Sequence, residues 1–250
     1  MQEINQQLTQ LKLAGVRDAL EQQQTQANTY AELSFTERLQ ILLAHELTQR
    51  EQRRIERLIK QAKFRQRAEL GDIQYKASRN LDKAQIRTLG QSDWLHHAHN
   101  LVITGATGCG KTYIACAIGQ AHCRQGKSVL YLRLKELLEQ MYIAQAEGSY
   151  RKLVTKLIKA DLLIIDDWGL EPLNANQRSD LLELIDGRYD QHSTLIISQL
   201  PISSWYEMIG ESTHADAILD RLVHRSIKIE LKGESMRKMT KSLTHGDQEK

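Results

Sequence analysis

A glycine-rich octapeptide stands between an apolar run and a helical pattern, and it restricts the fold of this chain more than any other segment. Residues 105–112 read Gly-Ala-Thr-Gly-Cys-Gly-Lys-Thr; residues 101–104 suit a short strand, and residues 113–118 continue as an apolar helix. Glycines let the backbone curl so that successive N–H groups point inward, and the start of the helix adds the positive end of its dipole. Strand, loop and helix in this order favour a phosphate-binding loop over a chance glycine-rich turn.

The loop predicts a site for a nucleoside triphosphate and its magnesium ion. Lys111 is expected to reach the β- and γ-phosphates, and the Thr112 hydroxyl is expected to bind Mg²⁺. The residues expected to contact the nucleotide are Gly105, Ala106, Thr107, Gly108, Cys109, Gly110, Lys111, Thr112 and Tyr113.

A second motif places acids at the end of a buried strand. Residues 161–167 read Asp-Leu-Leu-Ile-Ile-Asp-Asp, with no helical periodicity. Asp166 is expected to end the strand and to hold magnesium through a water. Asp167 is expected to polarise the water that attacks the triphosphate, with capping of the next turn as the alternative.

A third apolar strand, at residues 194–199, ends in Ser198 and Gln199 before Leu-Pro. Polar ends of parallel strands meet at the ligand crevice of such a sheet. Either side chain is therefore a candidate sensor of the γ-phosphate. Neutral turn chemistry ahead of Pro201 is the alternative explanation.

From residue 100 onward, strand and helix patterns alternate, which is typical of a parallel α/β sheet. Strands are expected at residues 101–104, 128–132, 161–166, 194–199 and, as a final edge strand, 227–231. Helices are expected from about residue 111 and at residues 134–146, 149–159, 176–189, 203–209 and 214–224. The predicted fold class is α/β, a three-layer P-loop core with an N-terminal all-helical extension and no C-terminal lid domain.

The chain of 250 residues is expected to hold one core domain and an extension. Residues 1–70 have helical spacing, with a glutamine-rich polar link at 21–28, and are expected to contact DNA, a partner or a neighbouring subunit. The remaining predicted parts are a connecting segment at 71–98, the core at 99–235 and a polar, disordered tail at 236–250.

Positive charge is concentrated in one predicted helix. Residues 50–67 hold eight basic and two acidic side chains. Such an excess can neutralise DNA phosphates without reading sequence, whereas an ordinary solvated helix face would carry more acidic partners. A second basic helix is expected at 149–159. The residues expected to contact DNA are Arg50, Arg53, Arg54, Arg57, Lys60, Lys63, Arg151, Lys152, Lys156 and Lys159.

The sequence also argues against a membrane or secreted protein. No run approaches the roughly 20 apolar residues of a membrane span, and the first residues lack the parts of a signal peptide. The cysteines at positions 109, 116 and 123 are expected to share one helix face, beyond disulfide reach, and complete no zinc pattern. A cytoplasmic protein is predicted.

The motifs together resemble the AAA+ ATPases. The likeness lies in the loop, in Leu-Leu-Ile-Ile-Asp-Asp-Trp-Gly at 162–169, in Ser-Gln-Leu-Pro at 198–201 and in Ala-Ile-Leu-Asp-Arg-Leu at 217–222. With Gly-Glu-Ser-Met-Arg at 233–237, the chain resembles more closely the IstB/DnaC branch, and within it the IstB ATPases encoded beside the transposases of insertion sequences. The resemblance covers the whole chain and is most specific from residue 100 to residue 238.

The resemblance implies ATP as the nucleotide and assigns further roles. Gln199 falls at the first sensor position, where a shorter Asn or Thr is usual. Arg221 falls where an arginine finger reaches the γ-phosphate held by the neighbouring subunit, with Arg225 as the reserve candidate. Asp167 stands where many relatives have Glu, and Arg237 falls near a second sensor that a lid domain normally carries.

The function implied by the resemblance is that of an ATPase that regulates transposition. ATP between subunits would hold a homo-oligomer together on the phosphate backbone of double-stranded DNA, the oligomer would recruit the cognate transposase, and hydrolysis would loosen it. A DnaC-like helicase loader is the nearest alternative, disfavoured because residues 1–98 contain no Cys. A small-molecule P-loop kinase is a third, disfavoured because residues 134–160 offer no arginine-rich lid.

Overall fold

The computed structural model describes residues 2–75 and 79–233. The chain divides into two compact units, Met1–Arg57 and Leu58–Lys250. Helices α1 (Gln2–Gln10), α2 (Ala14–Thr25) and α3 (Ala27–Tyr30) belong to the first unit, and α4 (Phe35–Ala62) begins there. The predicted assignment of 236–250 to a tail and of Arg237 to a sensor lies outside the described residues.

In the first unit, a carboxylate of α4 binds the first backbone N–H groups of α2 and so joins the two helices. The Glu46 carboxylate accepts hydrogen bonds from the backbone N–H groups of Gly15 and Val16, at 2.7 and 3.1 Å, and pairs with Arg50 at 2.6 Å. A Cβ on Gly15 would lie 2.7 Å from the Glu46 Cα, so only glycine permits this approach. Glu46 therefore satisfies N–H groups that the first turn of any helix leaves without a partner.

The predicted polar link at 21–28 is wrong, because most of this stretch is helical. Helix α2 continues to Thr25, and α3 follows it almost at once. Gln23 is buried and donates to the Arg38 carbonyl at 3.0 Å. Glutamine is a good helix former, and here a tertiary hydrogen bond satisfies its amide.

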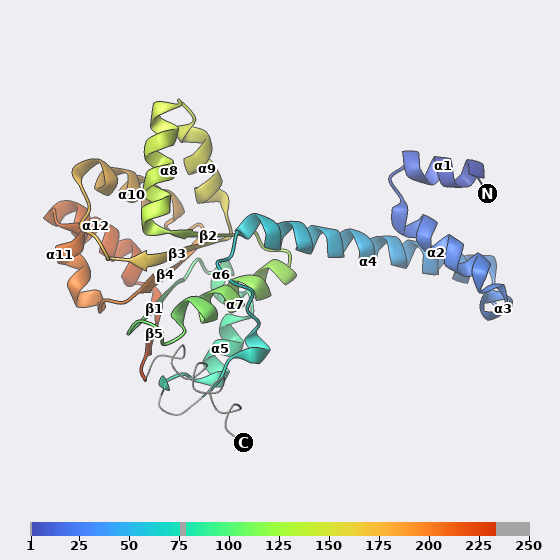
Figure 1. Cartoon of the computed structure of the whole chain (residues 1–250), viewed down its shortest axis with the longest axis horizontal. Coiled ribbons are helices and arrows are strands. Elements are labelled where there is room, and N and C mark those ends of the chain that lie inside the picture. Colours follow the sequence, from blue (N-terminus) through green and yellow to red (C-terminus); the bar gives the residue numbers. More distant parts are fainter. Residues whose placement is uncertain (1, 76–78, 234–250) are drawn as a thin grey trace, which may run out of the picture. The chain divides into compact units, whose positions relative to one another are not determined.

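The second unit contains a five-stranded parallel sheet in the order β2-β3-β4-β1-β5 (Figure 1). The strands are β1 (Asn100–Gly105), β2 (Val129–Arg133), β3 (Leu162–Trp168), β4 (Ser193–Ser198) and β5 (Ser226–Leu231). The predicted α/β P-loop fold with a helical extension is confirmed, and β5 is an edge strand as expected.

Helices cover both faces of the sheet and form the outer layers (Figure 1). One core joins Ile103 and Ile164 to η1 (Leu70–Asp72), α5 (Lys83–Leu89), α6 (Asp93–His96) and α7 (Lys111–Arg124). The other core joins Val102 and Ile165 to the remaining helices. These are α8 (Leu134–Ala146), α9 (Tyr150–Lys159), α10 (Ala175–Arg188), η3 (Ile202–Ser204), α11 (Trp205–Ile209) and α12 (Ser212–Val223). Successive strand residues point to opposite faces, which is why strands buried on both faces show no alternation.

Two local predictions need correction. Asp166 does not end its strand, since β3 continues to Trp168 with a register irregularity after Ile165. Cys109 lies in the loop before α7 and does not share a helix face with Cys116, although all three cysteines are buried and free. Among the described helices, none is long and apolar enough to cross a membrane.

Candidate nucleotide-binding site

The loop between β1 and α7 is shaped by glycines in backbone conformations that other residues rarely adopt. The φ angles of Gly105, Gly108 and Gly110 are +143°, +79° and +92°. A Cβ on Gly105 would also lie 2.3 Å from the Leu231 carbonyl oxygen of β5. The loop therefore requires glycine both for its curvature and for its close approach to the neighbouring strand.

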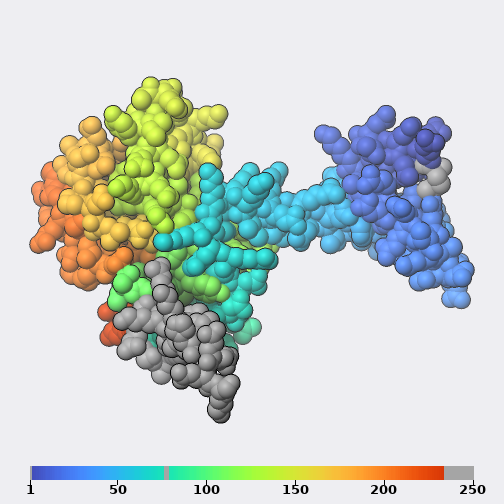
Figure 2. Space-filling model, in the orientation of Figure 1, coloured from blue at the N-terminus to red at the C-terminus, as the bar shows by residue number. Residues whose placement is uncertain are grey.

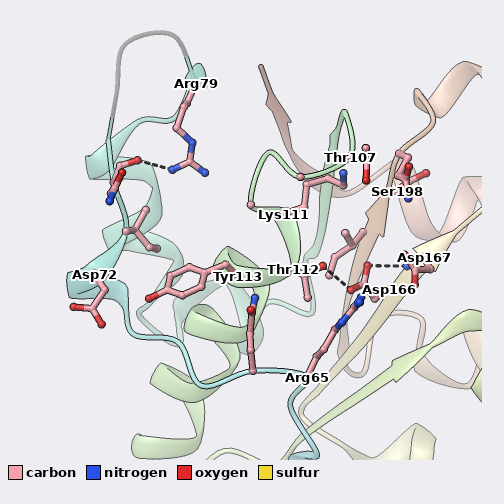
Figure 3. Close-up of a pocket in the computed structure, with 17 residues that line it drawn as sticks. Arg65, Asp72, Arg79, Thr107, Lys111, Thr112, Tyr113, Asp166, Asp167 and Ser198 are labelled. Carbon is pink, nitrogen blue, oxygen red and sulfur yellow. Dashed lines mark hydrogen bonds between the residues drawn. The ribbon is translucent and has the colours of Figure 1, made fainter. Parts of the chain in front are cut away.

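A cavity of about 430 Å³ opens beside this loop (Figure 3). Its floor comes from the start of α7, and one wall comes from the carboxyl ends of β3 and β4, where ligands of open parallel sheets bind. The facing wall comes from the chain that precedes β1. The lining residues are Arg65, Gln66, Asp72, Ile73, Gln74, Arg79, Thr107, Gly108, Gly110, Lys111, Thr112, Tyr113, Asp166, Asp167, Ile197, Ser198 and Gln199.

The Lys111 ammonium group is buried at the centre of the loop. Its Nζ donates to the Gly105 and Ala106 carbonyl oxygens, at 2.7 and 2.8 Å. Within residues 2–75 and 79–233, no carboxylate lies within 4.0 Å of it. A buried cation without an anionic partner is costly, so the loop is built to receive an anion.

The half-buried Thr112 and the buried Asp166 and Tyr131 form a hydrogen-bonded group beneath the loop. The Thr112 and Tyr131 hydroxyls both donate to Asp166 Oδ2, at 2.8 and 2.6 Å. Burial and the hydrogen bond to Asp166 raise the pKa of Tyr131 above its ordinary value, which keeps the phenol protonated. Paired hydroxyl and carboxylate oxygens suit Mg²⁺, which takes few protein ligands and completes its shell with phosphates and water.

Asp167 occupies a strained position beside this group. Its φ is +58°, and its N–H donates to Asp166 Oδ1 at 2.7 Å. Its carboxylate lines the cavity and lies 3.6 Å from Arg133 Nε at the end of β2. A non-glycine residue in the left-handed region is uncommon and often marks a functional site.

The two candidate sensors on β4 have different surroundings. The Ser198 hydroxyl donates to the Trp168 carbonyl at 2.8 Å and accepts from the Leu200 N–H at 3.0 Å, so it serves the turn. Gln199 is exposed and lines the cavity. Of the two, Gln199 has the freer side chain.

Several residues in or beside the cavity could not be assigned to it from the sequence. Tyr131 and Arg133 belong to an apolar strand pattern that says nothing about Asp166 or Asp167. Arg65 and Arg79 reach the cavity from the segment before β1, through contacts that no local pattern encodes. Tyr131 gave one sequence signal: a tyrosine within an apolar strand is expected to be buried, and its hydroxyl then needs a hydrogen-bond partner.

Arg221 and Arg225 do not join this cavity. The Asn100 side-chain amide, at the amino end of β1, donates to the Arg221 carbonyl at 2.9 Å, whereas the loop follows the carboxyl end of β1. Arg221 pairs with Asp186 at 2.7 Å, and Arg225 pairs with Asp190 at 2.8 Å. Both arginines therefore lie near the amino ends of the strands, whereas the loop of the same chain lies at their carboxyl ends.

The basic side chains predicted to contact DNA are all exposed. Those of α9 belong to the second unit, where Figure 2 shows α8 and α9 in yellow-green. On α4, Arg50 pairs with Glu46 and Arg54 pairs with Glu51. Helix α9 contains four basic residues and no acidic one, so its positive charge has no counterpart on the same helix.

Comparison with known proteins places this site in a family context. The family model described as IstB-like ATP binding protein matches residues 6–244. The chain is 49% identical, over 79% of its length and 86% of the relative's, to a protein of insertion sequence IS1162 from Pseudomonas fluorescens, named as ATP-binding. It is 45% identical, over 83% of its length and 84% of the relative's, to the insertion-sequence protein y4pL of Sinorhizobium fredii, also named as ATP-binding.

Among solved structures, the fold is similar to the crystal structure of the DnaC helicase loader. The TM-score is 0.57 at 21% identity, covering 66% of this chain and 97% of that chain. At this identity the similarity concerns the fold alone.

Proposed function

This chain belongs to the family of IstB-like ATP-binding proteins, and we propose that it is an ATP-dependent regulator that assembles on target DNA and recruits the transposase of its insertion sequence. The observation that carries the proposal is the family match over residues 6–244, which spans both the cavity and the helical extension. Relatives named as insertion-sequence proteins support the context.

ATP would bind with its phosphates on the loop and Lys111. Thr112 and Asp166 would hold Mg²⁺, whose charge would offset that of the β- and γ-phosphates. Gln199 would sense the γ-phosphate from β4. The cavity suits this ligand because it combines buried donors, an unpaired cation and oxygen ligands within one space.

Hydrolysis would convert ATP and water to ADP and phosphate. Asp167 would accept a proton from the attacking water as the bond between the γ-phosphorus and the bridging oxygen breaks. Arg221 would compensate the charge that develops on the γ-phosphate. Since Arg221 lies at the opposite edge of the sheet, a second copy of the chain would have to supply it. ATP would therefore join subunits, and its hydrolysis would loosen them.

DNA would be held by its phosphates on the exposed cations of α4 and α9. These contacts would give affinity without sequence specificity. We assign the helical segment at 1–70 to DNA, oligomer and partner contacts, the segment at 71–98 to the connection, and residues 99–235 to the ATPase core.

Removing Arg53, Arg54 and Arg57 by substitution with alanine is expected to weaken DNA binding. Each lost phosphate contact removes about 0.9 from the slope of log K against log salt, so the slope should fall by roughly 2 to 3. Fluorescence anisotropy with duplex DNA, at salt concentrations from low to physiological, measures this slope. Neutralising the exposed Lys83, Arg87 and Lys228 is the control with the same charge change. An unchanged slope in the α4 variant would assign α4 another role.

Tyr131→Phe is expected to weaken binding of magnesium together with ATP. The phenol orients the Asp166 carboxylate, and losing such a partner of a metal ligand typically costs about 10- to 100-fold in metal affinity. Calorimetric titration with ATP, in magnesium and separately in a chelator, should show the loss only with magnesium. Tyr142→Phe, at an exposed tyrosine, is the matched control. Equal losses in both buffers would contradict the assignment of Asp166 to the metal.

The proposed function is tested with the full chain, duplex DNA and a slowly hydrolysed ATP analogue. We expect an oligomer on DNA by electron microscopy, and retention of tagged cognate transposase on the DNA only when the analogue is present. A replicative helicase serves as the competing partner in a parallel capture. Capture of the helicase alone would overturn the proposal in favour of a loader.

A further inference from the structure

Arg79 is a buried arginine for which residues 2–75 and 79–233 provide no ion-pair partner. Its side chain is among the buried polar groups, with 6% exposure, and it lines the nucleotide cavity. Nη2 donates to the Cys109 carbonyl in the loop at 2.8 Å, and Nη1 donates to the Gln74 carbonyl. Nε has no hydrogen-bond partner among the residues that the structure describes.

No carboxylate compensates this guanidinium within the part of the chain that the structure describes, at the 4.0 Å limit of an ion pair. Buried charges in proteins are normally paired, because removing an isolated charge from water is costly. Lys111, also unpaired, lines the same cavity. Two unpaired buried cations around one cavity indicate an anionic occupant with more than one charge.

The glycine at position 110 keeps room for Arg79. A Cβ at Gly110 would lie 2.8 Å from Arg79 Nη2. The φ of +92° at Gly110 is what requires glycine at this position, and the guanidinium lies close against the space that a side chain here would fill. The arginine is therefore fitted against the peptide of the loop.

Position within the cavity indicates which phosphates Arg79 would meet. Figure 3 shows Arg79 on the wall formed by the segment before β1, with Asp166 and Asp167 on the facing wall. The expected magnesium and γ-phosphate lie with the acids. A triphosphate with its γ-phosphate at the acids would place its nucleoside-proximal phosphates, which ATP and ADP share, on the side of Arg79.

We propose that Arg79 is a phosphate-binding residue, which contacts the nucleoside-proximal phosphates of the bound nucleotide with its free N–H groups. The inference rests on the proposed nucleotide binding and adds a cation from outside the loop. A guanidinium suits this task because it can donate to loop carbonyls and to phosphate oxygens at the same time.

The test compares Arg79→Gln, Arg79→Lys and wild type in the full chain, by calorimetric titration with ATP and with ADP. Loss of a charged hydrogen bond predicts that Arg79→Gln weakens both nucleotides by a similar factor, about tenfold or more. Arg79→Lys should recover part of the loss because it keeps the charge. The Tm of ligand-free Arg79→Gln should stay near that of wild type, since removal of an unpaired buried charge offsets the lost hydrogen bonds to carbonyls. Arg87→Gln, at an exposed arginine of α5, is the control.

Three outcomes separate the possibilities. Unchanged affinity of Arg79→Gln, in a wild type that binds ATP, overturns this inference alone. Reduced affinity with a clearly lowered ligand-free Tm, and with Arg79→Lys no better than Arg79→Gln, makes Arg79 a structural support of the loop and also overturns it. Failure of the wild type to bind either nucleotide overturns the proposed function.

Discussion

Lys111→Ala is expected to abolish nucleotide binding and, with it, assembly on DNA. The ammonium group is the central cation of the loop, and its present acceptors are two loop carbonyls that phosphates would replace or join. A charge-assisted hydrogen bond contributes about 1.5 to 3 kcal/mol, so losing contacts to two phosphates should weaken ATP by about a thousandfold. Calorimetry gives the affinity, and sedimentation with duplex DNA gives the assembly.

The control for this variant is Lys135→Ala, which removes an exposed lysine charge and one weak surface ion pair to Glu171. Circular dichroism and the Tm establish that Lys111→Ala is folded. The substitution also leaves the Gly105 and Ala106 carbonyls without their present donor, so a small change in Tm is expected. If Lys111→Ala assembled on DNA in the presence of ATP as the wild type does, the assignment of the loop as the nucleotide-binding site would be refuted.

Arg221→Ala is expected to lower the rate of ATP hydrolysis by about a thousandfold while leaving the affinity for ATP unchanged. Arginine fingers of this kind contribute roughly 10³- to 10⁵-fold to the rate. ATP binding by the loop of the same chain should not change, because Arg221 lies near the amino end of β1 and the loop follows its carboxyl end. Steady-state phosphate release and calorimetry measure the two quantities.

Mixing two inactive variants tests whether the finger acts between subunits. Asp167→Asn should bind ATP and fail to hydrolyse it, and Arg221→Ala should fail for lack of the finger. At a mixed interface, an intact Asp167 from one subunit meets an intact Arg221 from the other, so part of the activity should return. Arg225→Ala, which breaks the pair with Asp190, tests the reserve candidate in the same way, and Asp186→Asn measures the structural contribution of the ion pair between Asp186 and Arg221. A mixture that stays inactive would argue against a finger at position 221.

The sheet was largely predictable, because β3 and β4 are buried on both faces and their apolar runs stand out against the polar turns. Predicted and observed strand ends differ by a residue or two, as for β2 and β4. The two larger errors each depend on a particular contact that the sequence does not reveal. The glutamines of α2 looked like a polar link because composition does not reveal that Gln23 bonds to a carbonyl 15 residues away. The predicted strand ended at Asp166 because the apolar run stops there, whereas β3 continues through Asp167, whose φ is +58° and whose N–H donates to Asp166 Oδ1, to Trp168.

The residues of the candidate site also differ in whether the sequence could predict them. Gly110, Lys111 and Thr112 are contiguous, and their chemistry depends on the backbone of one loop, so a short pattern identifies them. Tyr131 meets Asp166 across 35 residues, and Arg79 meets Cys109 across 30. Contacts at such separations depend on how the sheet and its preceding segment pack, and neither periodicity nor spacing carries that information.

The sequence by itself determined a phosphate-binding loop, a pair of acids after a buried apolar run, a basic helix and a parallel α/β core, since each is encoded by residues adjacent in the chain or repeated at a fixed period. Only the tertiary structure decided which side chains surround the loop. Tyr131 donates to Asp166, Arg133 lies beside Asp167, and Arg79 donates to the carbonyl of Cys109. It also placed Arg221 at the far edge of the sheet from its own loop. The physical reason is that burial and unpaired charge arise from long-range packing, which brings together residues that the sequence keeps apart.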